Sequence, residues 1–177
     1  MKFYKRFVPE QNEYGAFYMN YLNNVNGLSI SEAFAKDEHE WSNFFNHLDD
    51  SKVHFSYAEG KWTIAELILH QIDTEAIFAG RALKLIRREV QPLPGFDQDD
   101  YVKNSRASKE TKESLKSQWE ITRHYMRSVL SNARDEDLEY IGTANGSPIS
   151  ARVIGLIIPG HNLHHFRIIK ERYEIGI

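Results

Sequence analysis

Apolar side chains recur at spacings of three and four in four separate stretches of the chain, and this spacing is typical of amphipathic helices. The stretches begin near Ser29 or Ser31, at Thr63, near Ser108 and at Ser150, and the first three end near residues 47, 89 and 133. No stretch shows the strict alternation of a half-buried strand. The pattern therefore predicts an all-α fold built on four long helices.

Local signals mark several ends of these helices. Thr63 followed three residues later by Glu66 forms a capping box, the clearest helix start in the sequence. Prolines and a glycine in residues 91–95 end that helix, and the connection over 91–107 is long enough to act as a functional lid. Pro159 lies inside the last helical pattern, so we expect a kink just before His161.

The chain of 177 residues is short enough for one hydrophobic core, and we expect one domain over residues 29–177. Residues 1–28 are rich in Asn, Tyr and Gly and suggest an extended arm with an irregular turn, whose place on the bundle the sequence does not give. Residues 141–148 have turn chemistry and could form a short hairpin.

Composition narrows the classes of function. Hydrophobic residues make up 41% and charged residues 27% of the chain, and the mean hydropathy is -0.54, so we expect no membrane association. The basic N-terminal residues are followed by no apolar stretch, which predicts a cytoplasmic protein without a secretory signal. A net charge of -3 gives no general attraction for nucleic acid. We expect the one basic cluster to be a solvated helix face; it comprises Arg81, Lys84, Arg87 and Arg88.

The sequence has no cysteine, so any metal ion must be held by His, Asp or Glu. His161 and His165 are four residues apart on a helix, which places two imidazoles on one face. His70 lies beside the apolar stripe of the second helix and is the best candidate for a third ligand. Three imidazoles would leave coordination positions open, as in catalytic rather than structural zinc sites.

Simpler explanations of these histidines stay open at this point. A single histidine beside the core, such as His70, is commonly a structural residue, and the spacing of His161 and His165 can arise by chance among eight histidines. His164 competes for the site, although His165 continues the apolar face better. The other histidines lie among polar neighbours and are expected at the surface: His39, His47, His54 and His124.

Two segments of the chain resemble the DinB/YfiT-like family. Residues 57–75, YAEGKWTIAELILHQIDTE, are similar to the family segment in which Lys-Trp-Ser/Thr leads to the first metal histidine. Residues 159–173, PGHNLHHFRIIKERY, resemble the family's Gly-His-x-x-His-His ending. Shorter matches at 82–87, 95–97 and 101–102 lie between them, so the resemblance covers roughly residues 38–173.

The resemblance implies a four-helix bundle with one long crossover connection, a metal site formed by His70, His161 and His165, and a homodimer. Known members of the family include S-transferases that use low-molecular-weight thiols such as bacillithiol, mycothiol-dependent isomerases, and proteins induced by DNA damage without an assigned reaction. The chain departs from the family pattern at Ala76, where many relatives have Arg, and at Pro159, where a small residue is usual. These departures concern the pocket rather than the ligands.

The expected chemistry depends on the metal ion. A bound divalent ion lowers the pKa of its water from about 16 towards about 7 or binds a thiol as thiolate. Zinc and nickel are the favoured ions, with iron and manganese as alternatives, because imidazole suits all four. Asp73 could orient a ligand, act as a catalytic base or be a surface carboxylate, and Glu75 is expected to pair with an arginine.

The leading hypothesis is a metal-dependent transferase or hydrolase acting on a small molecule, which could be a low-molecular-weight thiol, in a pocket covered by residues 91–107. The alternative is a non-catalytic metal-bound bundle that serves in stress response or as a dimeric binding module. Direct DNA binding is disfavoured because the chain has an acidic balance and lacks a recognisable groove-binding motif.

Overall fold

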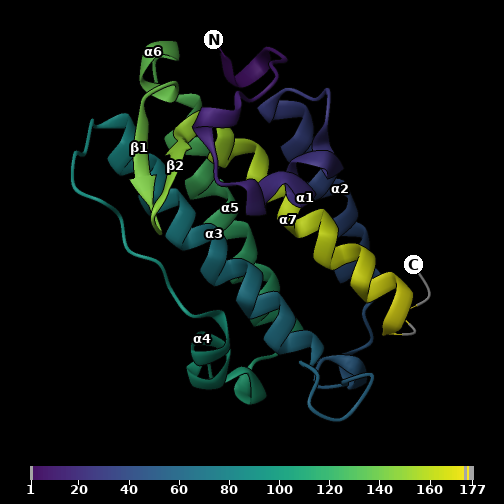
Figure 1. Cartoon of the computed structure of the whole chain (residues 1–177). Helices are drawn as coiled ribbons and strands as arrows, with labels where there is room; N and C mark the ends of the chain where they lie inside the picture. The colour runs from purple at the N-terminus through teal and green to yellow at the C-terminus, as the bar shows by residue number, and fades with distance from the viewer. Residues whose placement is uncertain (1, 174, 176–177) are drawn as a thin grey trace.

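Four long helices form a bundle in the computed structural model, which describes residues 2–173 and 175 (Figure 1). The expected all-α four-helix fold is confirmed. These helices are α2 (Ile30–His47), α3 (Ile64–Ile86), α5 (Lys112–Ser131) and α7 (Ala151–Arg172). The chain between α3 and α5 runs back along the length of the bundle, so these two helices point in the same direction (Figure 1). This return is the long crossover connection.

The helix starts follow the capping chemistry of the sequence. The hydroxyl of Thr63 accepts a hydrogen bond from the Glu66 amide while the Glu66 carboxylate accepts one from the Thr63 amide, as expected of a capping box. Ser29 and Glu32 form a second capping box at α2. Ser150 caps α7 by accepting from the Val153 amide.

Two helix ends differ from the expected positions. α3 ends at Ile86, three residues before the expected Glu89, since Arg88 adopts a left-handed conformation with φ of 63°. α5 begins after its cap Thr111 rather than at Ser108, because the extended backbone of Glu110 and Thr111 separates the short turn η6 (Ala107–Lys109) from the helix. α7 continues as a helix through Pro159, and the kink expected there stays a prediction.

The N-terminal arm is more helical than its composition suggested. It packs side chains of Phe3, Tyr14, Leu22 and Val25 into the core of the bundle, and this burial stabilises turns that Asn and Gly disfavour in isolation. Its elements are η1 (Lys2–Tyr4), η2 (Gln11–Glu13), η3 (Ala16–Tyr18), α1 (Met19–Leu22) and η4 (Asn23–Val25).

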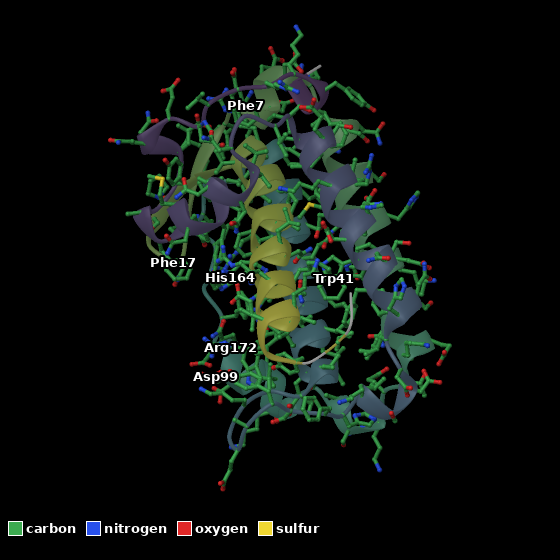
Figure 2. All side chains as sticks on the ribbon, turned by 90° about the vertical axis from the view of Figure 1, so that its right-hand side faces the viewer. Phe7, Phe17, Trp41, Asp99, His164 and Arg172 are labelled. Atoms are coloured by element: carbon green, nitrogen blue, oxygen red, sulfur yellow. The ribbon has the colours of Figure 1, made fainter. Side chains whose placement is uncertain are left out.

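The arm lies against α7 beside the histidine-rich segment. Figure 2 shows it on the side of α7 that carries His164, with Trp41 on the opposite side. The Asn24 amide donates to the Gly160 carbonyl oxygen at 2.9 Å. A Cβ atom at Gly160 would collide with the carbonyl oxygen of Tyr21, so glycine permits the close approach of α1 and α7.

A short hairpin joins the arm and the crossover at one end of the bundle. Strands β1 (Ile141–Ala144) and β2 (Ser147–Ser150) pair antiparallel around Asn145 and Gly146, both with positive φ, which confirms the expected hairpin. Leu93 of the crossover donates to Thr143 and accepts from Asn145. The smaller helices are η5 (Asp50–Lys52), α4 (Gln98–Asn104) and α6 (Asp135–Leu138).

The hydrophobic core consists of two clusters with a polar layer between them. One cluster packs beneath the arm and hairpin and includes Phe34, Phe78, Met126 and Ile158. The second lies towards the other end of the bundle and includes Trp41, Ile72, Trp119 and Phe166. On each long helix the residues between these positions include buried polar groups, and the candidate site is formed there. Among the described residues, no helix is long and apolar enough to cross a membrane.

Candidate metal centre

Three imidazole rings converge where α3 meets α7. His70 comes from the second turn of α3, and His161 and His165 come from successive turns of α7. The Nε2 atom of His161 lies 3.2 Å from Nε2 of His70 and 3.0 Å from Nε2 of His165. The ligand atoms of all three residues lie within 4.8 Å of one another. The structure thus brings together the three histidines singled out in the sequence.

Burial keeps these rings uncharged. His70 is 3% and His161 5% exposed, and His165 is half-buried. Desolvation lowers the pKa of His70 to about 4. It also places the pKa of His161 and His165 well below the usual range, with a smaller contribution from the neighbouring imidazoles. Neutral imidazoles carry free lone pairs at pH 7, which is the form that binds metal.

The donor set fits a divalent ion. In a tetrahedral site with bonds of about 2.0–2.1 Å from metal to imidazole nitrogen, two ligand nitrogens lie about 3.3 Å apart. The two short Nε2 distances are close to this value. Three neutral imidazoles would supply nitrogen ligands and leave a position for another ligand, and imidazole alone does not select one metal.

The rings are packed in place mainly by aromatic contacts. The indole of Trp62 lies 4.9 Å from the ring of His70, and the Tyr21 ring meets His161 edge-on at 5.0 Å. Among the described residues, the Nδ1 atoms of His161 and His165 have no hydrogen-bond partner.

Asp73 lies about one turn from His70 and is half-buried, and burial raises the pKa of its carboxyl group. Within the described part of the chain its side chain makes no hydrogen bond to the three histidines. Its role as base or ligand partner stays a prediction.

The remaining histidines lie apart from this cluster. His164 is half-buried, with its Nδ1 atom 3.4 Å from Arg167 and its ring against Tyr21. The four histidines expected at the surface are exposed: His39, His47, His54 and His124.

A cavity of about 220 Å³ opens beside His70 and His161. The arm, the crossover and the hairpin all contribute to its wall, and the crossover supplies Phe96 and Gln98, as expected of a segment that covers the pocket. The other lining residues are Phe17, Tyr18, Tyr21, Thr74, Phe78, Arg81, Asn145 and Ile157.

The sequence interpretation missed most of this wall, and it was wrong for Arg81. Lys84, Arg87 and Arg88 are exposed as expected, whereas Arg81 is only 5% exposed and faces the cavity. The arm and crossover cover this side of α3, and neither can be located from the periodicity of α3. A signal was available in the spacing of His70, Thr74, Phe78 and Arg81, which places all four on one helix face.

The buried polar layer takes one residue from each long helix. Arg123 of α5 donates to Glu75 of α3 at 2.7 Å and to Asp37 of α2 at 2.6 Å. Asn162 of α7, next to His161 in the chain, donates to Asp37 at 3.1 Å. The expectation that Glu75 pairs with an arginine is confirmed, whereas Asp37 and Asn162 were not anticipated. Burial raises the pKa of Asp37 to about 7 although Arg123 opposes this shift.

Known proteins share the fold and the sequence pattern. The family model of the DinB superfamily matches residues 33–169, and the chain belongs to that superfamily. No curated protein matches the sequence significantly.

Two solved structures are similar at low sequence identity. YfiT from Bacillus subtilis, described as a probable metal-dependent hydrolase with an unusual four-helix bundle topology, has 17% identity and a TM-score of 0.63, over 93% of this chain and 90% of YfiT. A mycothiol-dependent maleylpyruvate isomerase has 14% identity and a TM-score of 0.67, over 86% of this chain and 64% of the isomerase. This chain therefore spans less than two thirds of that isomerase, and at these identities both likenesses concern the fold.

Proposed function

We propose that the protein is a metal-dependent enzyme of the transferase or hydrolase type, acting on a small molecule in the cavity beside the three histidines. The observation that carries this proposal is the convergence of three neutral imidazoles, two of which, His70 and His161, line that cavity. His70, His161 and His165 would hold zinc or nickel, or alternatively iron or manganese. The ion would supply Lewis acidity at a position left free by the protein ligands.

The residues around the cluster have distinct tasks in this proposal. Tyr21 and Trp62 fix two of the imidazole rings and limit the access of water. Asp73 would take a proton from the incoming thiol or water, and its raised pKa brings the carboxyl group closer to the working pH of a base. The description of YfiT as a probable metal-dependent hydrolase and the thiol dependence of the isomerase indicate the two reaction classes to test first.

Elemental analysis of protein purified without a His-tag tests the metal site. We expect about one ion per chain in the wild type and well under one in His70→Ala, His161→Ala or His165→Ala. His164→Ala is the matched control, because it lies on the same helix outside the cluster and should keep the ion. Full occupancy in the His70→Ala variant would refute the three-ligand site.

A screen of thiol conjugation and ester hydrolysis, run with metal-loaded and chelator-treated samples, then tests the enzyme. Turnover should require the ion and fall sharply in the Asp73→Asn variant, while that variant keeps its metal. Turnover after complete metal removal would eliminate the mechanism. Full metal occupancy without turnover would instead favour a non-catalytic metal-bound module.

We also propose that the protein is a homodimer, as the family resemblance implies. Apolar side chains at the surface, including Ile121 (67% exposed) and Tyr125 (46% exposed) on α5, support association through helix faces. Light scattering at micromolar concentration should give twice the chain mass of 20.7 kDa, and a mass near 20.7 kDa would contradict the dimer.

A further inference from the structure

The charge of Arg81 is buried in the wall of the cavity without an acidic partner. Its side chain is among the buried polar groups, at 5% exposure, and its Nη2 atom donates to the Pro94 carbonyl oxygen at 2.6 Å. The guanidinium lies over the rings of Phe78 and Phe96, at 4.8 and 5.9 Å from their centroids. Within the part of the chain that the structure describes, no carboxylate forms an ion pair with it.

Buried Arg123 and half-buried Arg152 have carboxylate partners, unlike Arg81. Arg123 pairs with two carboxylates in the polar layer, and Arg152 pairs with the buried carboxylate of Glu13. These pairings follow the general rule that a buried charge is stable only when it is compensated. Arg81 departs from this rule within the same molecule, and its side chain lies in the wall of the cavity.

No neighbouring group supplies the missing negative charge. The hydroxyl of Tyr18 forms a hydrogen bond with Arg81, but burial raises the pKa of Tyr18, which keeps the phenol neutral at pH 7. The carboxylate of Asp97 on the crossover is exposed and accepts from backbone amides at the start of α4. Burial lowers the pKa of Arg81, yet arginine starts so high that the side chain stays charged.

The position of Arg81 relative to the histidines sets the shape of a ligand. His70 and Arg81 lie on the same face of α3, eleven residues apart, so their Cα atoms are separated by about 16 Å along the helix. Thr74 and Phe78 line the cavity between them. Most of the remaining wall is aromatic and comes from Phe17, Tyr18, Tyr21 and Phe96.

We propose that the cavity binds an elongated, largely apolar or aromatic molecule whose carboxylate pairs with Arg81. The planar guanidinium matches a carboxylate through paired hydrogen bonds, and the aromatic walls match the apolar body. The far end of the molecule lies at His70 and His161, so the anion is held away from the reacting end. This proposal rests on the proposed function only for the chemistry at the end of the molecule near the histidines, because recognition of the carboxylate by Arg81 needs no metal.

Calorimetry on the chelator-treated protein tests the proposal without any contribution from a metal. The probes are the phenylalkanoates from phenylacetate to 6-phenylhexanoate, each compared with its primary amide, which has nearly the same shape and no charge. At least one acid should bind about tenfold or more tightly than its amide, because a hydrogen bond between charged groups contributes more binding free energy than a hydrogen bond to a neutral amide.

Variants assign that preference to one residue. Arg81→Gln should reduce the preference to less than about twofold, whereas Arg87→Gln, an exposed arginine on the same helix, should leave it unchanged. Arg81→Lys keeps the charge but not the paired geometry, and it should keep part of the preference even if Arg81→Gln folds poorly.

Two outcomes would overturn the proposal. The first is that the acids bind no better than their amides, or that neither binds. The second is that the preference for the acid survives in Arg81→Gln. Failure of the metal site would look different. It would show as a wild type without bound metal, or as full metal occupancy in the histidine variants, with the carboxylate preference unchanged.

Discussion

Replacing Arg123 by methionine should destabilise the bundle more than a typical substitution, because it leaves two carboxylates buried without their cation. Asp37 is fully buried and Glu75 is 1% exposed, and both accept hydrogen bonds from Arg123. Methionine is long and apolar, so it keeps much of the packing against Phe34 and Trp119. Breaking a buried pair in this way costs about 3–5 kcal/mol, against about 5–15 kcal/mol for the whole fold of a typical domain.

Urea denaturation of the metal-free protein, followed by circular dichroism, measures this loss. With a slope of about 2 kcal/mol per molar urea, the midpoint at pH 8 should fall by about 2 M. Arg127→Met is the control, because Arg127 lies one turn further on α5, is half-buried and pairs with Glu38. That pair is partly solvated, so its loss should cost at most about 1 kcal/mol.

The cost of Arg123→Met should depend on pH with a defined sign. Burial already raises the pKa of Asp37 to about 7 in the folded wild type, from an ordinary value of 3.8. Removing the cation raises it further, so the folded variant binds a proton that the unfolded chain releases above about pH 4. Protonation of Asp37 therefore stabilises the folded variant more than the folded wild type as pH falls from 8 towards 5, and the gap between the two proteins should narrow.

Adding Asp37→Asn to Arg123→Met should recover part of the loss at pH 8. A loss below about 1 kcal/mol at pH 8, or one that is constant from pH 5 to pH 8, would refute the assignment of Arg123 as the compensating charge of the polar layer.

Further predictions concern the arm, the histidines and a helix start. Gly160→Ala should displace the arm, because the added Cβ atom collides with the carbonyl oxygen of Tyr21, even though alanine favours the helix itself. Proteolysis within residues 15–27 should therefore become faster, and an unchanged rate of cleavage would contradict the role of Gly160 in holding the arm. In metal-free protein, folded His70, with its pKa of about 4, should contribute about 3 kcal/mol to a fall in stability from pH 6.5 to pH 4, because the unfolded chain binds a proton that the folded ring does not. His161 and His165 add to the same fall, so His70→Gln should make the slope shallower without abolishing it, and an unaltered slope would count against this reasoning. Thr63→Ala should cost about 1 kcal/mol by urea denaturation, and no loss would show the capping box to be dispensable.

The helices and the histidine cluster could be predicted because their signals are local. Capping residues such as Thr63 act within one turn, and the four-residue spacing of His161 and His165 fixes their common face. Glu75 could be anticipated as an ion-pair partner because it sits among apolar neighbours on α3. These features depend on contacts that the sequence pattern itself specifies.

The cavity wall could not be predicted because it depends on segments that meet only in the folded chain. Arg81 shares a helix face with His70 and Thr74, but its burial depends on the crossover and the arm, which cover that face. Asp37 shares the spacing of Ile30 and Trp41 on the apolar face of α2, but its partners cannot be assigned from that spacing, because Arg123 and Asn162 come from two other helices. Gly160 gives no sequence signal of the close contact with Tyr21 that holds the arm in place.

The contact between the arm and α7 forms one cavity from two segments of the chain, of which only one matches the superfamily model. The histidines lie in the segment that matches the superfamily, residues 33–169, whereas Phe17, Tyr18 and Tyr21 lie before it. Substitutions in this lining can change which molecules the cavity admits without altering the helices that carry the imidazoles. The imidazoles and this part of the lining thus lie on separate segments, and each can be replaced without rebuilding the other.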